Sequence, residues 1–454
     1  MGPRSSLESN TDSIITTRNS KKATRQARSL SASEIARNVK NFDVWSTYQG
    51  CEQVEFSDMP DELRGHVDEV FKTMGMLPSA WVDKSSKTYR RMKSQSSPEF
   101  LEFLSMAHKQ CPELFSDDVI VQASVELCDD MRSVFGAWKR LRRMRESQER
   151  LSEADYASNV YDVLRSMALS KCSYRSKCSI SLPQPQLRPR SQALRVLNTK
   201  TVIPDGAVFI PAAAVRDLSR SAESPYKRLK RSSLAGRASN AERSFVNQST
   251  PCVQLPSMPT FEFVSSFWED KKPIHHMLED AYRQNRMATA AALRHLDSLH
   301  VNVPVFGLVW SDGTVRAHVD WCIHDKKCDK DQRTIVRSAP FPGLDPVEEK
   351  DNKVFHEWRL DDPCEVIQVF LLIRNIDRWT MGTFRERIDD GIQHLVNSVF
   401  TERQKYRPWK RAGVLSVLTE QDENTSATMS AQQSSPEAKP KPKSKASRRH
   451  RRRS

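Results

Sequence analysis

Apolar residues recur at helical spacing over the first third of the chain. Between residues 58 and 150, the segments 63–71 and 100–107 carry them three or four positions apart. This period places the apolar side chains on one face of a helix. A capping-box pattern follows, in which Asp155 stands three positions after Ser152. We therefore predict a helical region over residues 41–150 and a new helix that begins at about residue 151.

After residue 200 the pattern becomes one of strands alternating with helices. Residues 201–210 form two short apolar pieces around a turn, and residues 261–268 form an apolar, aromatic run that is typical of a buried strand. An alanine-rich helical pattern follows at residues 277–300. These segments are predicted to belong to one folded domain.

A β-hairpin is predicted next. Two apolar runs, 303–310 and 314–321, flank the pair Asp312-Gly313, and an Asp-Gly pair between such runs is a strong hairpin signal. The chain then shows a strand pattern at 354–360. Two helices are predicted after this strand. The first begins at Pro363, since proline is tolerated at the first position of a helix, and the second spans residues 384–400.

The order of these elements predicts the fold class. One helix, two strands, a helix, three strands and two helices indicate an α/β domain over residues 151–405, with helices that flank the sheet. Composition predicts disorder elsewhere, because Ser-, Lys- and Arg-rich segments bury too little apolar surface to fold. These segments are a basic N-terminus at 1–40, a basic tail at 420–454 and a mobile basic insertion at about 219–250.

Positive charge is concentrated in the segments that are predicted not to fold. The chain has 454 residues, 71 Lys and Arg against 57 Asp and Glu, and a net charge of +14. Nine basic and no acidic residues follow position 438, and residues 1–40 carry eight basic against three acidic residues. These two segments account for the whole excess, so the domains are near neutral, unlike a dedicated DNA-binding surface.

The basic tail has two interpretations. It favours nuclear import or tethering of nucleic acid, and a non-specific polycation has the same composition. Residues 226–231 are a second candidate import signal. We expect a nuclear location, with the cytoplasm as the alternative.

Membrane and secretory classes do not fit the sequence. No run of about 18 apolar residues exists, so no membrane-spanning helix is expected. The start of the chain lacks the apolar segment of a secretory signal, which favours free thiols for the nine cysteines. The nearest zinc-like pattern is Cys322, His324 and Cys328, but a closed zinc site needs four ligands, so ordinary thiols are the favoured interpretation.

Two acids and a lysine occupy unusual strand positions. Asp205 follows the first of two apolar strand pieces, and Glu269 and Lys271 close the strand pattern at 261–268. Residues i and i+2 share a face of a strand, so Glu269 and Lys271 point to one side while Asp270 points to the other. If the two strands are neighbours, two carboxylates converge beside one ammonium group. Charges at the edge of a sheet core are costly unless they are paired or bind metal.

These residues resemble the PD-(D/E)XK motif of restriction-endonuclease-like nucleases, and more narrowly the fungal PD-(D/E)XK nuclease-like proteins. Pro204-Asp205 and Glu269-Asp270-Lys271 match the two halves of the motif. The gap between the halves is long, so the basic insertion must loop out for the strands to pair. The resemblance covers about residues 150–400.

Two further positions extend the resemblance. In the fungal proteins an acid on a helix precedes the first strand, followed by an aromatic residue and a valine, and Glu153, Tyr156 and Val160 stand in that relation here. Tyr156 replaces the more usual tryptophan. Those proteins also carry a glutamine on the helix after the second half of the motif, where Gln284 stands in this chain.

The resemblance implies a restriction-endonuclease-like mixed sheet flanked by helices and metal-dependent cleavage of DNA or RNA. Asp205 and Glu269 would hold Mg²⁺, or alternatively Mn²⁺, because hard cations prefer oxygen ligands. Lys271 would assist the attacking water, and Glu153 would serve as an auxiliary acid. Gln284 would contact the substrate or the surroundings of the metal.

Each of these residues also has a purely structural interpretation. An acid such as Glu153 is favoured in a first helical turn by the helix dipole. Asp205 suits a turn, and residues 269–272 suit a solvated strand end before Pro273. Gln284 suits a helix surface. A register that differed by one residue would transfer the roles to Asp270 and Lys272.

Three functions remain consistent with the sequence. The first is a nuclear, Mg²⁺-dependent nuclease. The second is the same fold kept as a non-cleaving scaffold that binds nucleic acid or protein, which the near-neutral domains favour. The third is a toxin built on such a nuclease.

Overall fold

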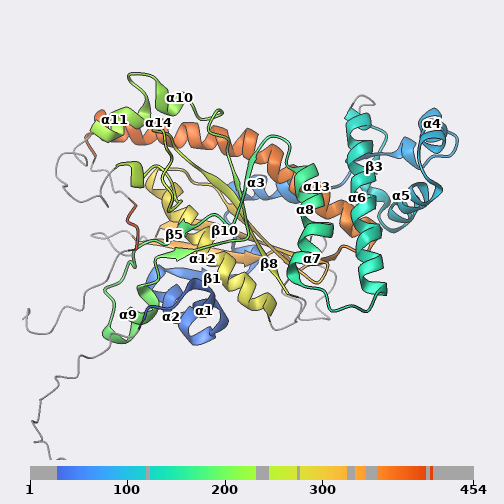
Figure 1. Ribbon diagram of the computed structural model, residues 1–454. Helices are drawn as coiled ribbons and strands as arrows, with labels where there is room; N and C mark the ends of the chain where they lie inside the picture. Colours follow the sequence, from blue (N-terminus) through green and yellow to red (C-terminus); the bar gives the residue numbers. More distant parts are fainter. Residues whose placement is uncertain are drawn as a thin grey trace, which may run out of the picture. The chain divides into compact units, whose positions relative to one another are not determined.

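A mixed β-sheet forms the centre of the protein, and helices flank both of its faces (Figure 1). The computed structural model describes residues 28–118, 123–231, 245–272, 277–324, 333–343, 355–404 and 409–412. The described ranges belong to one compact unit. The predicted α/β class, with a mixed sheet between helices, is confirmed.

The sheet has eight strands in the order β1-β11-β10-β9-β8-β7-β4, with β12 paired to β10. Neighbours are antiparallel except for the parallel pairs β1 with β11 and β8 with β9. The strands are β1 (Cys51–Gln53), β4 (Ser173–Ser176), β7 (Gly206–Phe209), β8 (Val264–Lys271), β9 (Val305–Ser311), β10 (Thr314–His324), β11 (Thr334–Pro340) and β12 (Glu357–Arg359). Two short ladders lie outside this sheet: β2 (Leu77–Pro78) with β3 (Phe115–Ser116), and β5 (Ile180–Ser181) with β6 (Thr201–Val202).

The predicted hairpin is confirmed as β9 and β10. Its two turn residues have positive φ, 50° at Asp312 and 68° at Gly313, which is the backbone conformation of a tight hairpin turn. The predicted strand at 261–268 is displaced toward the C-terminus, because β8 spans Val264–Lys271. Glu269 and Lys271 are therefore ladder residues of a central strand.

Helices from distant parts of the chain cover the two faces of the sheet. The helix α12 (Met277–Ser298) packs on β8, β9 and β10. On the opposite face lie α3 (Asp61–Phe71), α8 (Asp162–Ala168) and α13 (Pro363–Trp379), where the rings of Phe306 and Trp379 meet edge to face. A π-turn at Thr380–Phe384 leads from α13 into α14 (Arg385–Phe400) (Figure 1). Further short helices are α7 (Glu153–Tyr156), α9 (Leu194–Leu197) and α10 (Asp217–Arg220).

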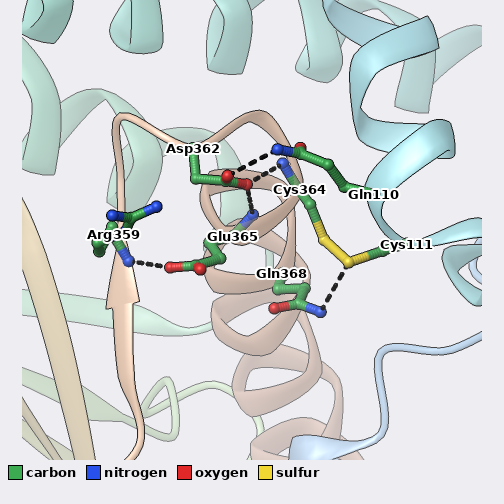
Figure 2. Close-up of a disulfide and its surroundings, with 7 residues drawn as sticks. All are labelled: Gln110, Cys111, Arg359, Asp362, Cys364, Glu365 and Gln368. Atoms are coloured by element: carbon green, nitrogen blue, oxygen red, sulfur yellow. Dashed lines mark hydrogen bonds between the residues drawn. A yellow bond between two sulfur atoms is a disulfide. The ribbon is translucent and has the colours of Figure 1, made fainter.

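The N-terminal helical region is packed onto the α/β domain. Its helices α3, α5 (Pro98–Gln110) and α6 (Ala123–Glu146) contact α13, and α4 (Lys87–Gln95) lies beyond them. Figure 2 shows a disulfide that joins Cys111, at the end of α5, to Cys364 in the first turn of α13, with a Cα–Cα distance of 6.2 Å. The expectation of free thiols is therefore wrong for these two cysteines, because a contact between residues 253 positions apart has no local sequence signal.

Residues 32–40 are also ordered, which corrects the prediction of disorder up to residue 40. The helix α1 (Ala32–Arg37) begins with a capping box formed by Ser31 and Glu34, and α2 (Val39–Gln49) follows it. Ile35 is fully buried, and α1 packs on α12. A few apolar positions, Ala32, Ile35 and Ala36, are enough to fold this short polar segment because α12 supplies the rest of the interface.

The predicted mobile insertion at 219–250 is ordered at both ends. The helix α11 (Pro225–Arg231) lies in its first half, and Phe245 packs with Tyr226 and Phe261 in an aromatic cluster. Residues 232–244 lie outside the described ranges, as does the predicted basic tail. The aromatic residues explain why a segment of basic composition still folds at its ends.

Gly307 of β9 provides a test of the side-chain packing between β9 and β10. A Cβ atom at this position would collide with the imidazole ring of His318 on β10, which is fully buried. We expect Gly307→Ala to lower the free energy of unfolding by about 1–3 kcal/mol, the usual cost of overpacking. Gly65→Ala in α3 is the control, since nothing lies within 4 Å of its Cβ position. The control should be neutral or stabilising by about 0.5–1 kcal/mol, and equal urea midpoints for the two variants would contradict the packing.

Candidate active site

The turn between β6 and β7 positions Asp205 beside the end of β8. Gly206 pairs with Trp268 in the antiparallel ladder of β7 and β8, so the next residues outward, Asp205 and Glu269, lie opposite each other. The Asp205 side chain is 18% exposed, and its Oδ2 accepts a hydrogen bond of 2.8 Å from the backbone N–H of Asp270. The two strands are therefore neighbours, and their register brings the two predicted carboxylates together.

Glu269 is buried at the end of the sheet, with an exposed fraction of 1%. Its Oε1 accepts a hydrogen bond of 2.6 Å from the Nζ of Lys271. Its Oε2 is buried and has no hydrogen-bond partner among the described residues. A buried carboxylate oxygen without a donor is costly, so this oxygen marks a position where a further positive group would be favourable.

The electrostatics of this cluster follow from burial and from charge crowding. Burial raises the pKa of Glu269 to about 8, and the neighbouring carboxylates of Asp205 and Asp270 act in the same direction against Lys271. The pKa of Asp205 is also raised, chiefly by burial, although the N–H of Asp270 opposes the shift. Burial alone would lower the pKa of Lys271, but the adjacent carboxylates, with Glu269 foremost, raise it above its usual value.

Glu153 reaches the same cluster from the helical side. It is the first residue of α7, whose predicted capping box between Ser152 and Asp155 is present, and the π-turn at Ala157–Tyr161 follows directly. Burial raises the pKa of Glu153, with the charge of Asp205 as the second cause. Glu153 and Asp205 line one pocket, of about 570 Å³. The first-turn position predicted from the helix dipole is therefore compatible with a place in the cluster.

Asp270 points to the opposite face and is paired with Arg165 of α8. The guanidinium donates two hydrogen bonds to the carboxylate, one of them 2.9 Å from Nη1 to Oδ2. Arg165 is 2% exposed, and aromatic rings of Tyr161, Trp268 and Trp310 surround it. This pair holds the end of β8, whose N–H at residue 270 in turn holds Asp205. Asp270 thus has a partner of its own, and Lys272 is exposed.

Two residues of the pocket were missed from the sequence. Lys177 has a φ of 49° and follows β4; its N–H donates to the carbonyl of Asp205 over 3.1 Å, and its Nζ lies 3.7 Å from Asp205 Oδ1. Arg165 is the other. An arginine on a predicted helix has no local signal of burial, and only the pairing with a residue 105 positions away reveals it. The pocket is lined by Glu153, Ala154, Ala157, Asp162, Arg165, Ser166, Leu169, Tyr174, Ser176, Lys177, Asp205 and Asp270.

Gln284 does not line the pocket that contains Glu153. It lies on α12 with 9% of its surface exposed, and it lines a second pocket of about 510 Å³. Residues around the start of α1 and the Lys200–Ile203 segment form the other walls of that pocket. Asp205, Glu269 and Lys271 meet at the end of β8, and Glu153 shares the first pocket with Asp205. Glu269 and Lys271 do not line that pocket, and Gln284 lines the second one.

The donors present suit a hard divalent cation only in part. Two carboxylates, Asp205 and Glu269, lie at the same end of the β7–β8 ladder, and Mg²⁺ commonly takes one or two carboxylates and keeps several waters. The buried, unpartnered Oε2 of Glu269 fits this requirement. Across the described ranges, no group of three or more His, Cys, Asp or Glu residues is arranged to hold a metal ion. A cation at this position would therefore depend on water and substrate for its remaining ligands.

Two of the three residues of the zinc-like pattern, Cys322 and His324, lie in the described ranges. The Nε2 of His324 lies 3.2 Å from Asp297 Oδ1, and Cys322 is half-buried on β10. Cys328 lies outside the described ranges.

Comparison with known proteins does not assign a family: no family model matches the chain, and no curated protein matches it. Within the described part of the chain, no helix is both long enough and apolar enough to cross a membrane.

The raised pKa of Glu269 makes a prediction about stability. When the pKa of an acid is higher in the folded than in the unfolded protein, the acid contributes stability that is fully present below the unfolded-state pKa. This contribution is lost as the pH rises through the folded-state pKa. In EDTA, the wild type should therefore lose stability relative to Glu269→Gln between about pH 5 and pH 8. Urea unfolding at four pH values measures this difference. Glu386→Gln, at an exposed position of α14, is the control and should keep a constant offset; a constant offset for Glu269→Gln as well would show that Glu269 titrates normally.

Proposed function

We propose that this protein is a metal-dependent phosphodiester hydrolase of the PD-(D/E)XK type, with a restriction-endonuclease-like fold. One observation carries the proposal. Glu269 is buried at the end of a central strand with one carboxylate oxygen unpartnered, opposite Asp205 and bonded to Lys271. Such an arrangement is expensive for stability alone, and it suits a site that receives a cation and an anionic substrate.

Asp205 and Glu269 are the residues that would hold Mg²⁺ or Mn²⁺. The chemistry that a bound divalent cation supplies at such a site is polarisation of the phosphate and a lower pKa for a bound water. The protein's own contribution is to keep both carboxylates in place. The N–H of Asp270 holds Asp205, and the ladder between β7 and β8 sets the distance between the strands.

Lys271 and Glu153 complete the proposed site. The pKa of Lys271 is raised, so its side chain stays protonated at neutral pH and acts as a donor that orients water and neutralises developing charge, rather than as a base. Glu153, whose pKa is raised by burial, would be the auxiliary acid. Gln284 is assigned here to the second pocket, where it would contact substrate only beyond the reacting phosphate.

DNA or RNA is the proposed substrate. Lys177 supplies an exposed ammonium group at the pocket, with 75% of its side chain exposed, and can meet a phosphate next to the cleaved one. Nuclear import through the basic segments remains part of the proposal, and the tail that motivates it lies outside the described ranges.

A non-cleaving scaffold is the second candidate. The observation that favours it is the ion pair between Lys271 and Glu269, because this contact already offsets part of the buried charge without a cation. A scaffold would bind nucleic acid or a protein independently of metal.

Cleavage assays separate the two candidates. Plasmid, single-stranded DNA and RNA are incubated with the wild type in Mg²⁺, Mn²⁺ or EDTA. We expect metal-dependent cleavage that falls by about 100-fold or more in Asp205→Asn, Glu269→Gln and Lys271→Ala, the order of effect of a lost charge-stabilising or acid–base group. Glu386→Gln should cleave like the wild type, and circular dichroism checks that each variant is folded.

Two outcomes would count against the nuclease. If folded Glu269→Gln still cleaves, Glu269 is not the residue that holds the metal ion. Binding of nucleic acid that is equal in EDTA and in Mg²⁺, with no cleavage by the wild type, would favour the scaffold.

A further inference from the structure

Cys178 and Cys252 form a close pair of thiols next to the candidate site. Their sulfur atoms lie 3.5 Å apart, although the residues are 74 positions apart in the chain. Cys178 is half-buried, and Cys252 is 1% exposed. A disulfide requires a sulfur–sulfur distance of about 2.05 Å, so the two sulfur atoms have to approach each other by about 1.5 Å to form a bond.

The backbone around the pair is fixed by hydrogen bonds from both segments. The N–H of Ser181 donates to the carbonyl of Pro251 over 2.9 Å, and the N–H of Val253 donates to the carbonyl of Ser179 over 2.8 Å. Arg411 adds a contact of 2.9 Å from its Nη1 to the carbonyl of Cys252. Both cysteines are therefore held on segments that cannot drift apart, which keeps the effective concentration of one thiol near the other high.

The two thiols have different surroundings. The hydrogen bond from Cys252 and the positive charge of Arg175 lower the pKa of Cys178 against the effect of its burial. The pKa of Cys252 is raised, first by its hydrogen bond to Cys178 and then by burial. Since thiolates are the attacking species in disulfide exchange and Cys178 is the more exposed sulfur, Cys178 is suited to react first.

We propose that Cys178 and Cys252 are a thiol–disulfide modification site that reacts with small-molecule disulfides such as oxidised glutathione. The Cys178 thiolate attacks one sulfur of the small disulfide, which forms a mixed disulfide and releases one thiolate. The Cys252 thiol then loses its proton and attacks the sulfur of Cys178, which releases the second thiolate. Two cysteine thiols are oxidised to one disulfide, and the small disulfide is reduced to two thiols.

The position of the pair connects it to the pocket. Cys178 directly follows Lys177, whose N–H and Nζ contact Asp205. The modification itself does not depend on the proposed function, because its chemistry involves only the two thiols and the oxidant.

Peptide mapping of the full-length protein tests the proposal. The reduced protein is equilibrated with mixtures of oxidised and reduced glutathione, quenched with N-ethylmaleimide and digested without reductant. We expect a peptide linked through Cys178 and Cys252 to be at least about tenfold more abundant than any link among Cys51, Cys128, Cys172 and Cys322, the remaining free cysteines of the described ranges. Dithiothreitol should reverse the link.

Variants test the order of the two steps. Cys252→Ser should trap Cys178 as a mixed disulfide with glutathione, whereas Cys178→Ser should leave Cys252 unmodified. Cys128→Ser is the matched control and should leave the link unchanged, since Cys128 is also buried. The proposal is overturned if, in the folded wild type with excess oxidised glutathione, both thiols are recovered as N-ethylmaleimide adducts or as separate glutathione adducts. Because the wild-type result decides this, failure of a variant to fold would not rescue the proposal.

Discussion

The cost of burying the Glu269 carboxyl group governs how this end of the sheet is built. An ionised carboxylate taken out of water costs several kcal/mol unless opposite charge and hydrogen bonds replace the lost hydration. Glu269 lies on β8, which has β7 on one side and β9 on the other, and its side chain is buried. Lys271 satisfies one oxygen, and the other has no donor among the described residues. The neighbouring groups are arranged around this incomplete compensation.

The alternation of the strand divides the charges of its last three residues between two faces. Glu269 and Lys271 point toward α12, whose residues pack on Val309 beside Glu269. Asp270 points toward α8, and Asp205 lines the same pocket as Asp270. The Arg165–Asp270 pair is buried among aromatic rings and anchors the strand end from behind. The backbone N–H of residue 270 links the end of β8 to the turn before β7, because it donates to Asp205. A rigid strand end is what a site needs if two carboxylates are to be held at a fixed separation.

The sequence predicted those elements, and those members of the Asp205–Glu269–Lys271 cluster, whose structure depends on neighbouring residues in the chain. The alternation of β8 fixed the faces of Glu269 and Lys271, the Asp312-Gly313 pair fixed the hairpin, and Ser152 with Asp155 fixed the start of a helix. The restriction-endonuclease-like topology goes beyond these patterns and stays a proposal. The polar edge strand β4 was missed, because an edge strand of polar residues has no apolar alternation to detect.

The remaining features depend on contacts between distant residues. Arg165 lies on the buried face of α8 together with Leu164 and Ala168, and its buried partner Asp270 lies on β8. Cys111 with Cys364, and Cys178 with Cys252, are brought together only by the packing of segments that are far apart in the chain. The short helix α1, which lies in the basic N-terminus, is folded because its buried Ile35 packs against α12. Gln284 lines a different pocket from the one that was predicted, because a position on a helix does not by itself determine which pocket the side chain enters.

Binding of Mn²⁺ tests directly whether the buried carboxylate of Glu269 is a cation ligand. The measurement requires no substrate. Mn²⁺ is titrated into the wild type and into Glu269→Gln, and free Mn²⁺ is followed by electron paramagnetic resonance. We expect one Mn²⁺ site per chain in the wild type and its loss in folded Glu269→Gln. Equal binding by both proteins, or no binding by the wild type at millimolar Mn²⁺, would contradict it.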